Sequence, residues 1–174
     1  MVNNAGIGAF GDVLEQAPED WDRVIETHLN ACFLLSKVVV TSMVKQRRGK
    51  IINIASLYAV FGAAFASSYS AAKGAVVQLT KSMAIELAPF NIQVNALAPG
   101  FIETDLTESM KTTPVYREVI ARTPAGRGLI PTNAPARPCF WRPVLRILSP
   151  GQPSSWMVVT PSGEPHEAKP VAPR

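Results

Sequence analysis

Three side chains that could move a proton lie close together in the sequence. Tyr69 and Lys73 are four residues apart, so on a helix they share one face. Ser56 lies thirteen residues before Tyr69, directly after an apolar segment. A phenol has an ordinary pKa of about 10, and a neighbouring ammonium favours the phenolate. The spacing predicts that Tyr69 exchanges a proton with an alcohol or carbonyl oxygen, with Lys73 lowering the pKa of the phenol.

A Tyr–Lys pair also has a purely structural interpretation, because any wetted helix can carry these residues four apart. The position of Ser56 favours the catalytic one. Parallel strands place their ligands at their carboxyl ends, and both Ser56 and the segment Ala98–Gly100 follow short apolar runs. We therefore expect three separate segments of the chain to converge on one crevice.

The N-terminal loop carries a glycine pattern that could be taken for a nucleotide site. Gly6, Gly8 and Gly11 have the spacing of a dinucleotide-binding loop. That loop requires a buried strand before it and an acidic residue at the end of the next strand. Only Met1 and Val2 are available to form that strand. The acidic residue at the expected distance, Glu26, falls inside a predicted helix. We interpret the pattern as a flexible strand-to-helix loop.

The composition indicates one ordinary soluble domain. The chain has 174 residues, of which 47% are hydrophobic and 17% are charged. No uncharged apolar run approaches the roughly 20 residues of a membrane span, and the first residues do not resemble a secretory signal. We expect a cytoplasmic protein without a membrane partner. The two cysteines, Cys32 and Cys139, predict neither a disulfide framework nor a metal site.

The last part of the chain differs from the rest. Residues 128–174 hold five Lys or Arg against two Glu, which is +3 of the net +4, and ten of the fifteen prolines. Proline removes backbone donors and breaks helices and central strands. We predict a structured domain over 1–127 and an irregular, solvated basic tail over 128–174, without a nucleic-acid partner.

Alternating helices and strands are expected within 1–127. Pro18 followed by acidic residues begins a helix that ends near Gln46. A strand over 50–54, a helix from about 68 to 88 and a strand over 92–98 follow. The apolar face of the first helix is predicted from the three- and four-residue spacing of Trp21, Val24, Ile25, Leu29, Cys32, Phe33 and Ser36. Short connections between such elements produce right-handed crossovers and a parallel sheet.

These residues resemble the classical short-chain dehydrogenase/reductase family over 2–127. Asn3-Asn4-Ala5-Gly6 resembles a family motif, Ser56 the active-site serine, and Tyr69 with Lys73 the Tyr-x-x-x-Lys pair. By resemblance, Tyr69 is the proton donor and acceptor, Ser56 orients the substrate oxygen and Lys73 holds the nicotinamide ribose. Asn95 with Pro99-Gly100 resembles the family's cofactor motif that follows a strand. The cofactor residues that the resemblance implies are Asn4, Ala5, Gly6, Tyr69, Lys73, Pro99, Gly100, Ile102 and Thr104.

One catalytic position departs from the family. In the register set by Trp21 to Val24, the residue in place of the family's helix asparagine is His28 rather than Asn30. Two residues correspond to about 200° around a helix, so Asn30 cannot take over that role. His28 is a candidate for an imperfect proton relay to Lys73, or else a histidine with a structural role.

The resemblance implies a partial Rossmann-type, doubly wound parallel sheet of which only the second half is present. It implies NAD or NADP as cofactor, a small-molecule alcohol or carbonyl substrate, and a homo-oligomer, a tetramer or dimer built on the two long helices. The family's glycine-rich dinucleotide loop has no counterpart in this sequence, and without that loop a pyrophosphate loses its helix N-terminus. We expect weak or absent cofactor binding by this chain.

Two further expectations concern the second half. The segment 103–124, with Met110, Tyr116 and Val119, is predicted to form a substrate lid. The tail, read one base earlier, permits the family's Val-Asp-Gly-Gly-Tyr motif at 156–160, so a single-base deletion near codon 127 is a hypothesis for the unusual composition. Two functions stay open: an alcohol or carbonyl oxidoreductase, and a non-catalytic remnant that pairs through its helices.

Overall fold

A three-stranded parallel sheet forms the centre of the molecule. The computed structural model describes residues 1–108, 110–121, 128, 157–159 and 165–167. Its strands are β1 (Val2–Asn3), β2 (Gly49–Ile54) and β3 (Ile92–Leu97), in the order β1-β2-β3. All pairs are parallel, with Val2 opposite Ile52 and Ile52 opposite Asn95. The predicted α/β fold with a parallel sheet is confirmed.

A long helical segment connects β1 to β2. It consists of α1 (Pro18–Ile25), a π-helical turn η1 (Glu26–Asn30) and α2 (Ala31–Gln46). Pro18 and two acidic residues occupy the first turn. Proline there costs no hydrogen bond, and the acidic side chains interact favourably with the positive end of the helix dipole. The segment ends where Arg47 adopts a left-handed conformation with φ 48°. The predicted helix is continuous over this range, but the widened turn η1 was not predicted.

The buried stripe of this helix is narrower and more polar than the sequence pattern predicted. Every fourth residue is buried, and the stripe consists of Val24, His28, Cys32 and Ser36. Trp21 and Phe33, expected on the buried face, are 39% and 47% exposed. Val24, Cys32 and Ser36 are buried as predicted. The prediction was wrong for Trp21 and Phe33 because apolar periodicity assigns large hydrophobic side chains to the core, whereas this helix also buries His28, which was not on the predicted face.

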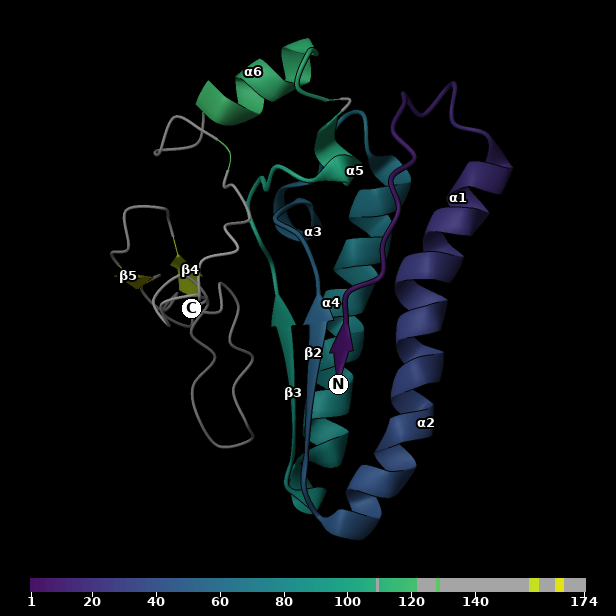
Figure 1. Ribbon diagram of the computed structural model, residues 1–174, viewed down its shortest axis with the longest axis vertical. Coiled ribbons are helices and arrows are strands. Elements are labelled where there is room, and N and C mark those ends of the chain that lie inside the picture. The colour runs from purple at the N-terminus through teal and green to yellow at the C-terminus, as the bar shows by residue number, and fades with distance from the viewer. Residues whose placement is uncertain (109, 122–127, 129–156, 160–164, 168–174) are drawn as a thin grey trace, which may run out of the picture.

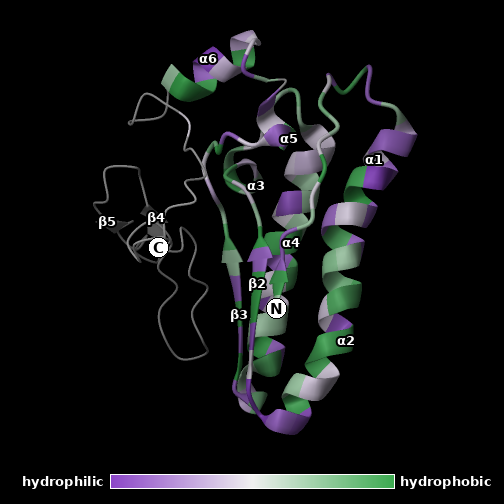
Figure 2. Cartoon of the chain, viewed as in Figure 1, coloured by the Kyte–Doolittle hydropathy of each residue, from purple (hydrophilic) through white to green (hydrophobic). Residues whose placement is uncertain are grey.

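The second long helix, α4 (Ser67–Leu87), lies beside α2 on the same side of the sheet (Figure 1). A 3-10 turn η2 (Ala88–Phe90) ends it at Pro89, as predicted from the restriction that proline imposes on the preceding residue. The main core cluster packs the C-terminal half of α4 against β2 and β3. Its buried residues are Ile51, Met83, Ala84, Leu87, Ile92 and Val94. Figure 2 shows the apolar residues that the two helices carry.

A polar network crosses the buried face of the sheet. Asn3 Nδ2 donates to Asn53 Oδ1 at 2.8 Å, and Asn53 Nδ2 donates to Thr80 Oγ1 at 2.9 Å. Thr80 in turn donates to the carbonyl of Val76 at 2.7 Å. Asn53 and Thr80 are fully buried, so these hydrogen bonds replace those to water. The network ties β1, β2 and α4 to one another.

The opposite face and the outer side of the helices expose apolar residues. Val2 is 59% and Ile52 is 38% exposed on the sheet. The helical segment Pro18–Gln46 is long and apolar enough, by length and composition alone, to span a membrane. A single helix of this kind is weak evidence, because the core helices of soluble proteins pass the same test.

The remaining described elements are short. A one-turn helix α3 (Tyr58–Phe61) follows β2, and α5 (Asp105–Glu108) and α6 (Pro114–Ala121) follow β3. In the segment predicted to be irregular, β4 (Met157–Val159) and β5 (Pro165–Glu167) form an antiparallel pair. Most of that segment, including Trp156 and Thr160 of the run 156–160 on which the frameshift hypothesis rests, lies outside the described residues. The boundary at 127 stays a prediction.

Candidate active site

The loops that follow β1, β2 and β3 meet at the carboxyl edge of the sheet. The backbone N–H of Gly11 donates to the carbonyl of Phe65 at 2.9 Å, which joins the first loop to the start of α4. The N–H of Ala55 donates to the carbonyl of Leu97 at 2.7 Å, which extends the pairing of β2 and β3 past the end of β2. A Cβ atom on Gly100 would lie 3.7 Å from the side chain of Leu57. These contacts place the third loop beside Ser56.

Tyr69 lies in the first turn of α4, half-buried among groups from four segments. The ring of His28 meets it edge to face at a centroid distance of 5.2 Å, and the ring of Phe10 lies 6.1 Å away. Lys73 Nζ lies 5.4 Å from the centre of the Tyr69 ring. The Ser56 hydroxyl is near enough to the phenol to lower its pKa. The structure thus brings together the four side chains that the sequence nominated for catalysis.

The pKa of Tyr69 is raised in the chain without a ligand. Burial raises the pKa of the phenol above 10 and the nearby Tyr58 raises it further, whereas the neighbouring Ser56 hydroxyl lowers it. Desolvation of the phenolate outweighs the other influences, and a pKa lowered by Lys73 together with an oxidised nicotinamide stays a prediction for the cofactor complex. At neutral pH, Tyr69 therefore holds its proton.

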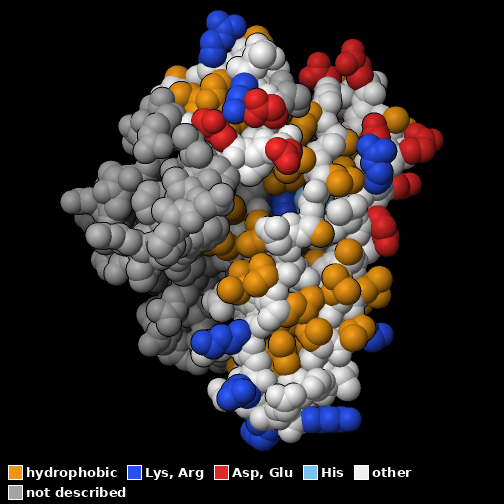
Figure 3. Space-filling view, in the orientation of Figure 1, with side chains coloured by type: hydrophobic (Ala, Val, Ile, Leu, Met, Phe, Trp, Pro, Cys, Tyr) orange, Lys and Arg blue, Asp and Glu red, His pale blue; other side chains and the backbone are white. Residues whose placement is uncertain are grey.

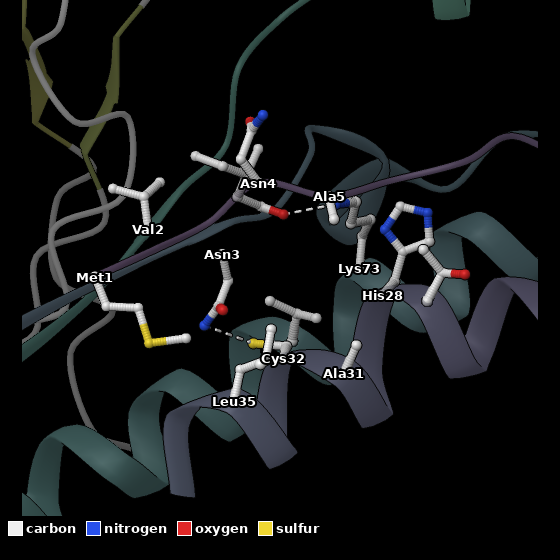
Figure 4. Close-up of a pocket in the computed structure, with 13 residues that line it drawn as sticks. Met1, Val2, Asn3, Asn4, Ala5, His28, Ala31, Cys32, Leu35 and Lys73 are labelled. Carbon is white, nitrogen blue, oxygen red and sulfur yellow. Dashed lines mark hydrogen bonds between the residues drawn. The ribbon is translucent and has the colours of Figure 1, made fainter. Parts of the chain in front are cut away.

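Lys73 is a buried lysine with only 4% of its surface exposed. Its ammonium donates to the carbonyl of Ile54 at 2.6 Å, at the end of β2. Burial lowers the pKa of Lys73 from 10.5 to about 8, an effect that the neighbouring Cys32 partly opposes. Lys73 is thus charged at neutral pH, with few partners for its charge. Figure 4 shows it near Ala5 and His28.

We expect Lys73→Met to stabilise the fold. At pH 7 the buried ammonium carries a penalty of about 3 kcal/mol, from 1.36 kcal/mol for each pKa unit, while loss of the bond to Ile54 costs about 1–2 kcal/mol. The net gain in the free energy of unfolding is then about 1–2 kcal/mol, measurable by urea denaturation. Lys37→Met, on an exposed lysine, is the control and should change stability by less than about 0.5 kcal/mol.

The gain should depend on pH with a defined sign. The pKa of Lys73 is lower in the folded chain, so between about pH 8 and pH 10.5 the unfolded chain binds more protons. The contribution of Lys73 to the free energy of unfolding of the wild-type chain therefore rises with pH across that window. The advantage of Lys73→Met should be full below pH 8 and should disappear by about pH 10.5. An advantage that is constant across this range would contradict the assigned cause.

His28 lies in the middle of η1 and is 4% exposed. Its Nε2 lies 2.8 Å from the carbonyl O and 3.2 Å from the backbone N of Ile7. Burial lowers the pKa of His28, Lys73 lowers it further, and the hydrogen bond with Ile7 raises it. Asn30 is exposed and donates to Glu26 on its own helix. Of the two candidates, only His28 reaches the site.

The proposed cofactor residues lie on two open loops at this edge. Asn4, Ala5, Gly6, Gly100 and Thr104 are exposed, and Pro99 and Ile102 are partly exposed. The exposed backbone of both loops beside a buried ammonium fits a nicotinamide nucleotide, whose ribose and carboxamide require hydrogen-bond partners. Asn95 is different, since it lies within β3 opposite Ile52, on the outer face of the sheet.

A cavity of about 120 Å³ lies between β1 and α2, below these loops (Figure 4). Asn3, His28, Cys32 and Lys73 contribute to its lining. Asn3 Nδ2 contacts the thiol of Cys32 at 3.4 Å and Ser36 Oγ at 3.1 Å. Asn3 Oδ1 and His28 Nδ1 are buried and have no hydrogen-bond partner among the described residues. The region behind Lys73 is therefore polar and incompletely satisfied.

Gln16 is a structural contributor that the sequence did not indicate. Its Nε2 donates to Ser68 Oγ at 2.7 Å and to the carbonyl of Ala9 at 3.2 Å. Its Oε1 accepts a hydrogen bond from Ser67 Oγ at 2.8 Å. The two serines directly precede Tyr69, so Gln16 connects the first loop to the helix turn that carries the phenol. A glutamine within a loop has no sequence pattern that would reveal this.

The segment predicted as a lid lies over the site. Helix α6 stands above the carboxyl ends of the strands (Figure 1). Burial raises the pKa of Tyr58 on α3, and the charge of Glu118 on α6 raises it further. Phe101 and Tyr116 pack edge to face at 5.3 Å, and Met110 is buried. Residues 109 and 122–124 of the predicted lid lie outside the described part. In that part no group of three metal-ligating side chains occurs.

Comparison with known proteins identifies the same region. A family model described as short chain dehydrogenase matches residues 1–114. The 3-oxoacyl-(acyl-carrier-protein) reductase of Vibrio cholerae serotype O1 is 42% identical over 127 residues, which are 73% of this chain and 52% of the relative. The cyclopentanol dehydrogenase of Comamonas testosteroni is 40% identical over 132 residues, 75% of this chain and 53% of the relative. The chain spans about half the length of the curated relatives it matches.

Solved structures agree in fold. A gluconate 5-dehydrogenase from Burkholderia cenocepacia J2315, in complex with NADP and tartrate, has a TM-score of 0.71 and 36% identity, covering 74% of this chain and 51% of that chain. A mutant 4-hydroxyisoleucine dehydrogenase complexed with NADH and succinate has a TM-score of 0.70 and 32% identity, covering 75% and 54%. The matched half of these structures contains the parallel sheet described above.

Proposed function

Because this chain belongs to the short chain dehydrogenase family, we propose that its site serves an oxidoreductase that interconverts an alcohol and a carbonyl compound. The observation that carries the proposal is the environment of Tyr69. The phenol lies against Lys73 and His28, and the Ser56 hydroxyl is near enough to lower the pKa of the phenol. A proton donor and a second hydroxyl at one point are the groups needed to protonate and orient the oxygen atom of a carbonyl substrate.

The proton chemistry follows from the charge states of these residues. Tyr69 is protonated at neutral pH, so it is ready to donate a proton to a carbonyl oxygen. Ser56 donates a hydrogen bond to the same oxygen and orients it. Lys73, charged and close to the phenol, stabilises the phenolate that remains after donation. The reverse sequence takes the proton from an alcohol.

NAD or NADP is the proposed cofactor. When bound, the nicotinamide supplies or accepts the hydride. Lys73 and Tyr69 would hold its ribose, and the backbone of Asn4–Gly6 and of Pro99–Thr104 would hold the rest of this half of the cofactor. The related structures carry NADP in one case and NADH in another, which leaves both choices in the proposal.

A small-molecule alcohol or carbonyl compound is the proposed substrate. Residues 56–72, which flank the phenol, carry no charged side chain. Phe10 packs against both Tyr69 and Phe65, and Phe65 packs against Tyr58. These surroundings favour an uncharged reacting centre. The names of the relatives, a cyclopentanol dehydrogenase and an oxoacyl reductase, are consistent with that class.

Cofactor titration tests the proposal. We expect the fluorescence of NADH or NADPH to change on titration into the purified chain, with weak binding that requires cofactor at millimolar concentration. Lys73→Met should abolish the change, since it removes the partner of the ribose. Lys37→Met is the matched control and should retain it. The absence of any change with the wild-type chain would favour the second function described next.

A second candidate is a non-catalytic chain that pairs with its own kind through the long helices. Figure 3 shows apolar side chains gathered over the long helical segment. The exposed apolar residues of α2 include Phe33 at 47%, Leu34 at 52%, Leu35 at 53% and Val38 at 72%. A shallow groove of about 500 Å³ between α2 and α4 carries both Lys37 and Glu86, so a second copy could place opposite charges together. A homo-oligomer is compatible with either function.

A further inference from the structure

One ring nitrogen of His28 faces two backbone groups of opposite polarity. Nε2 lies 2.8 Å from the carbonyl O of Ile7 and 3.2 Å from its backbone N. A neutral imidazole nitrogen either donates or accepts, so Nε2 can satisfy only one of the two groups at a time. The shorter distance assigns the proton to Nε2, which donates to the carbonyl. Nδ1 is then an acceptor without a proton.

The other nitrogen has no route to water while the loop is in place. Nδ1 is buried without a hydrogen-bond partner in the part of the chain that the structure describes. Gly6 packs directly on the ring, since a Cβ atom there would lie 2.8 Å from Cε1, the carbon between the two nitrogens. Water can therefore reach Nδ1 only if the loop 4–8 or the ring moves.

The surroundings oppose a positive charge on this ring. Helix α4 presents Tyr69, edge to face at 5.2 Å, and Lys73, whose charge lowers the pKa of His28. The helix that carries His28 presents Cys32 one turn later, and the loop 4–8 has no titratable side chain. A second buried cation without an acceptor is unfavourable. A proton added to Nδ1 must therefore be hydrated, and this requires the ring or the loop to move, which breaks the contact between them.

We propose that His28 is a proton-controlled positioning residue: its neutral ring holds the loop 4–8 against α4, and uptake of a proton from solvent at Nδ1 releases the loop. The loop contains Asn4, Ala5 and Gly6, so the functional consequence rests on the proposed function, in which these residues contact the cofactor. Release would weaken cofactor binding at acid pH while Tyr69 and Lys73 keep their own charge states.

The sign of the effect follows from the lowered pKa of His28. The folded chain prefers the neutral ring, so the unfolded chain binds more protons between pH 6.5 and the lower folded value. The stabilisation from the neutral ring is complete above pH 6.5 and is lost as the pH falls through that window. The loop should open in the same range.

NMR of the full 174-residue chain tests this without any cofactor. The chain has two histidines, so His166 is a reference in the same spectrum. We expect the nitrogen shifts of His28 to report the Nε2–H form at neutral pH, and the ring to titrate below pH 6.5. The backbone amide signals of Gly6 and Ile7 should shift with the same midpoint as the ring.

Two variants separate positioning from a merely structural role. In His28→Asn the amide offers a donor and an acceptor at once and does not titrate, so the loop should stay closed and the pH dependence of the Ile7 amide should be lost. Gly6→Ala, whose Cβ displaces the ring, should raise the midpoint toward 6.5 and uncouple the loop. Gly11→Ala, which meets open space, is the matched control and should leave both titrations unchanged.

Several outcomes would overturn the proposal. An Ile7 amide that does not move as His28 titrates would do so, as would an amide that titrates equally in His28→Asn. A ring that takes up its proton with the loop signals unchanged would show that water reaches Nδ1 in another way. None of these results bears on redox activity, because no cofactor is present and Tyr69 is unaltered.

Discussion

In a complete version of the family's domain, replacing Tyr69 with phenylalanine is expected to reduce turnover by roughly a hundred- to ten-thousand-fold, the range that general acid–base groups contribute. The change removes one oxygen atom and leaves the ring contacts with His28 and Phe10 in place. Cofactor affinity should therefore change little, because Lys73 and the two loops are intact. The measurement is the rate of hydride transfer, followed by nicotinamide fluorescence, together with a binding titration.

Tyr116→Phe is the matched control for this variant. Its hydroxyl makes only a long contact of 3.5 Å with Glu103, in the segment above the site. The same loss of one oxygen there should leave turnover nearly unchanged. If Tyr69→Phe retained wild-type turnover in a preparation whose Tyr116→Phe form was also active, the proton would have to come from another group, and the assignment of Tyr69 would be wrong.

The second large effect is on stability, at Ile51. This residue is fully buried in β2 and belongs to the core cluster that joins the sheet to α4. Truncation of a buried isoleucine to alanine costs about 2–5 kcal/mol, because it removes apolar contacts and leaves a cavity. For a domain with total stability of about 5–15 kcal/mol, we expect Ile51→Ala to populate the unfolded chain at moderate temperature.

Ile52→Ala provides the comparison within the same strand. Neighbouring residues of a strand point to opposite faces of the sheet, and Ile52 is 38% exposed on the outer face. We expect a loss of less than about 1 kcal/mol there, measured by urea denaturation of both variants. Equal losses at the two positions would mean that the outer face is also covered in solution, for example by another part of the chain or by a second copy.

Much of the fold could be predicted from local sequence signals. Pro18 with its acids and Pro89 each stand close to a real helix boundary, because proline acts on the backbone of its immediate neighbours. The two strands of six residues were recognised as apolar runs of β-branched residues. The helix α3, the π turn η1 and the pair β4–β5 were not predicted, since no local signal distinguishes them from the surrounding segments.

The buried polar residues show where local signals fail. Asn53, Ser36 and Thr80 are fully buried, and each is buried because a partner arrives from a distant part of the chain. Asn53, for example, accepts from Asn3, fifty residues earlier, and donates to Thr80. The sequence contains these residues but not the pairing, so periodicity placed Trp21 and Phe33 in the core instead.

The order of residues alone supplies a phenol, an ammonium and a hydroxyl at spacings that a strand and a helix turn into neighbours. The pKa values of these groups, by contrast, depend on the folded environment. Burial raises the pKa of Tyr69 and lowers that of Lys73 to about 8, and it leaves one nitrogen of His28 without a partner. The physical reason is that spacing along the chain sets which groups can meet, whereas desolvation depends on everything else that packs around them.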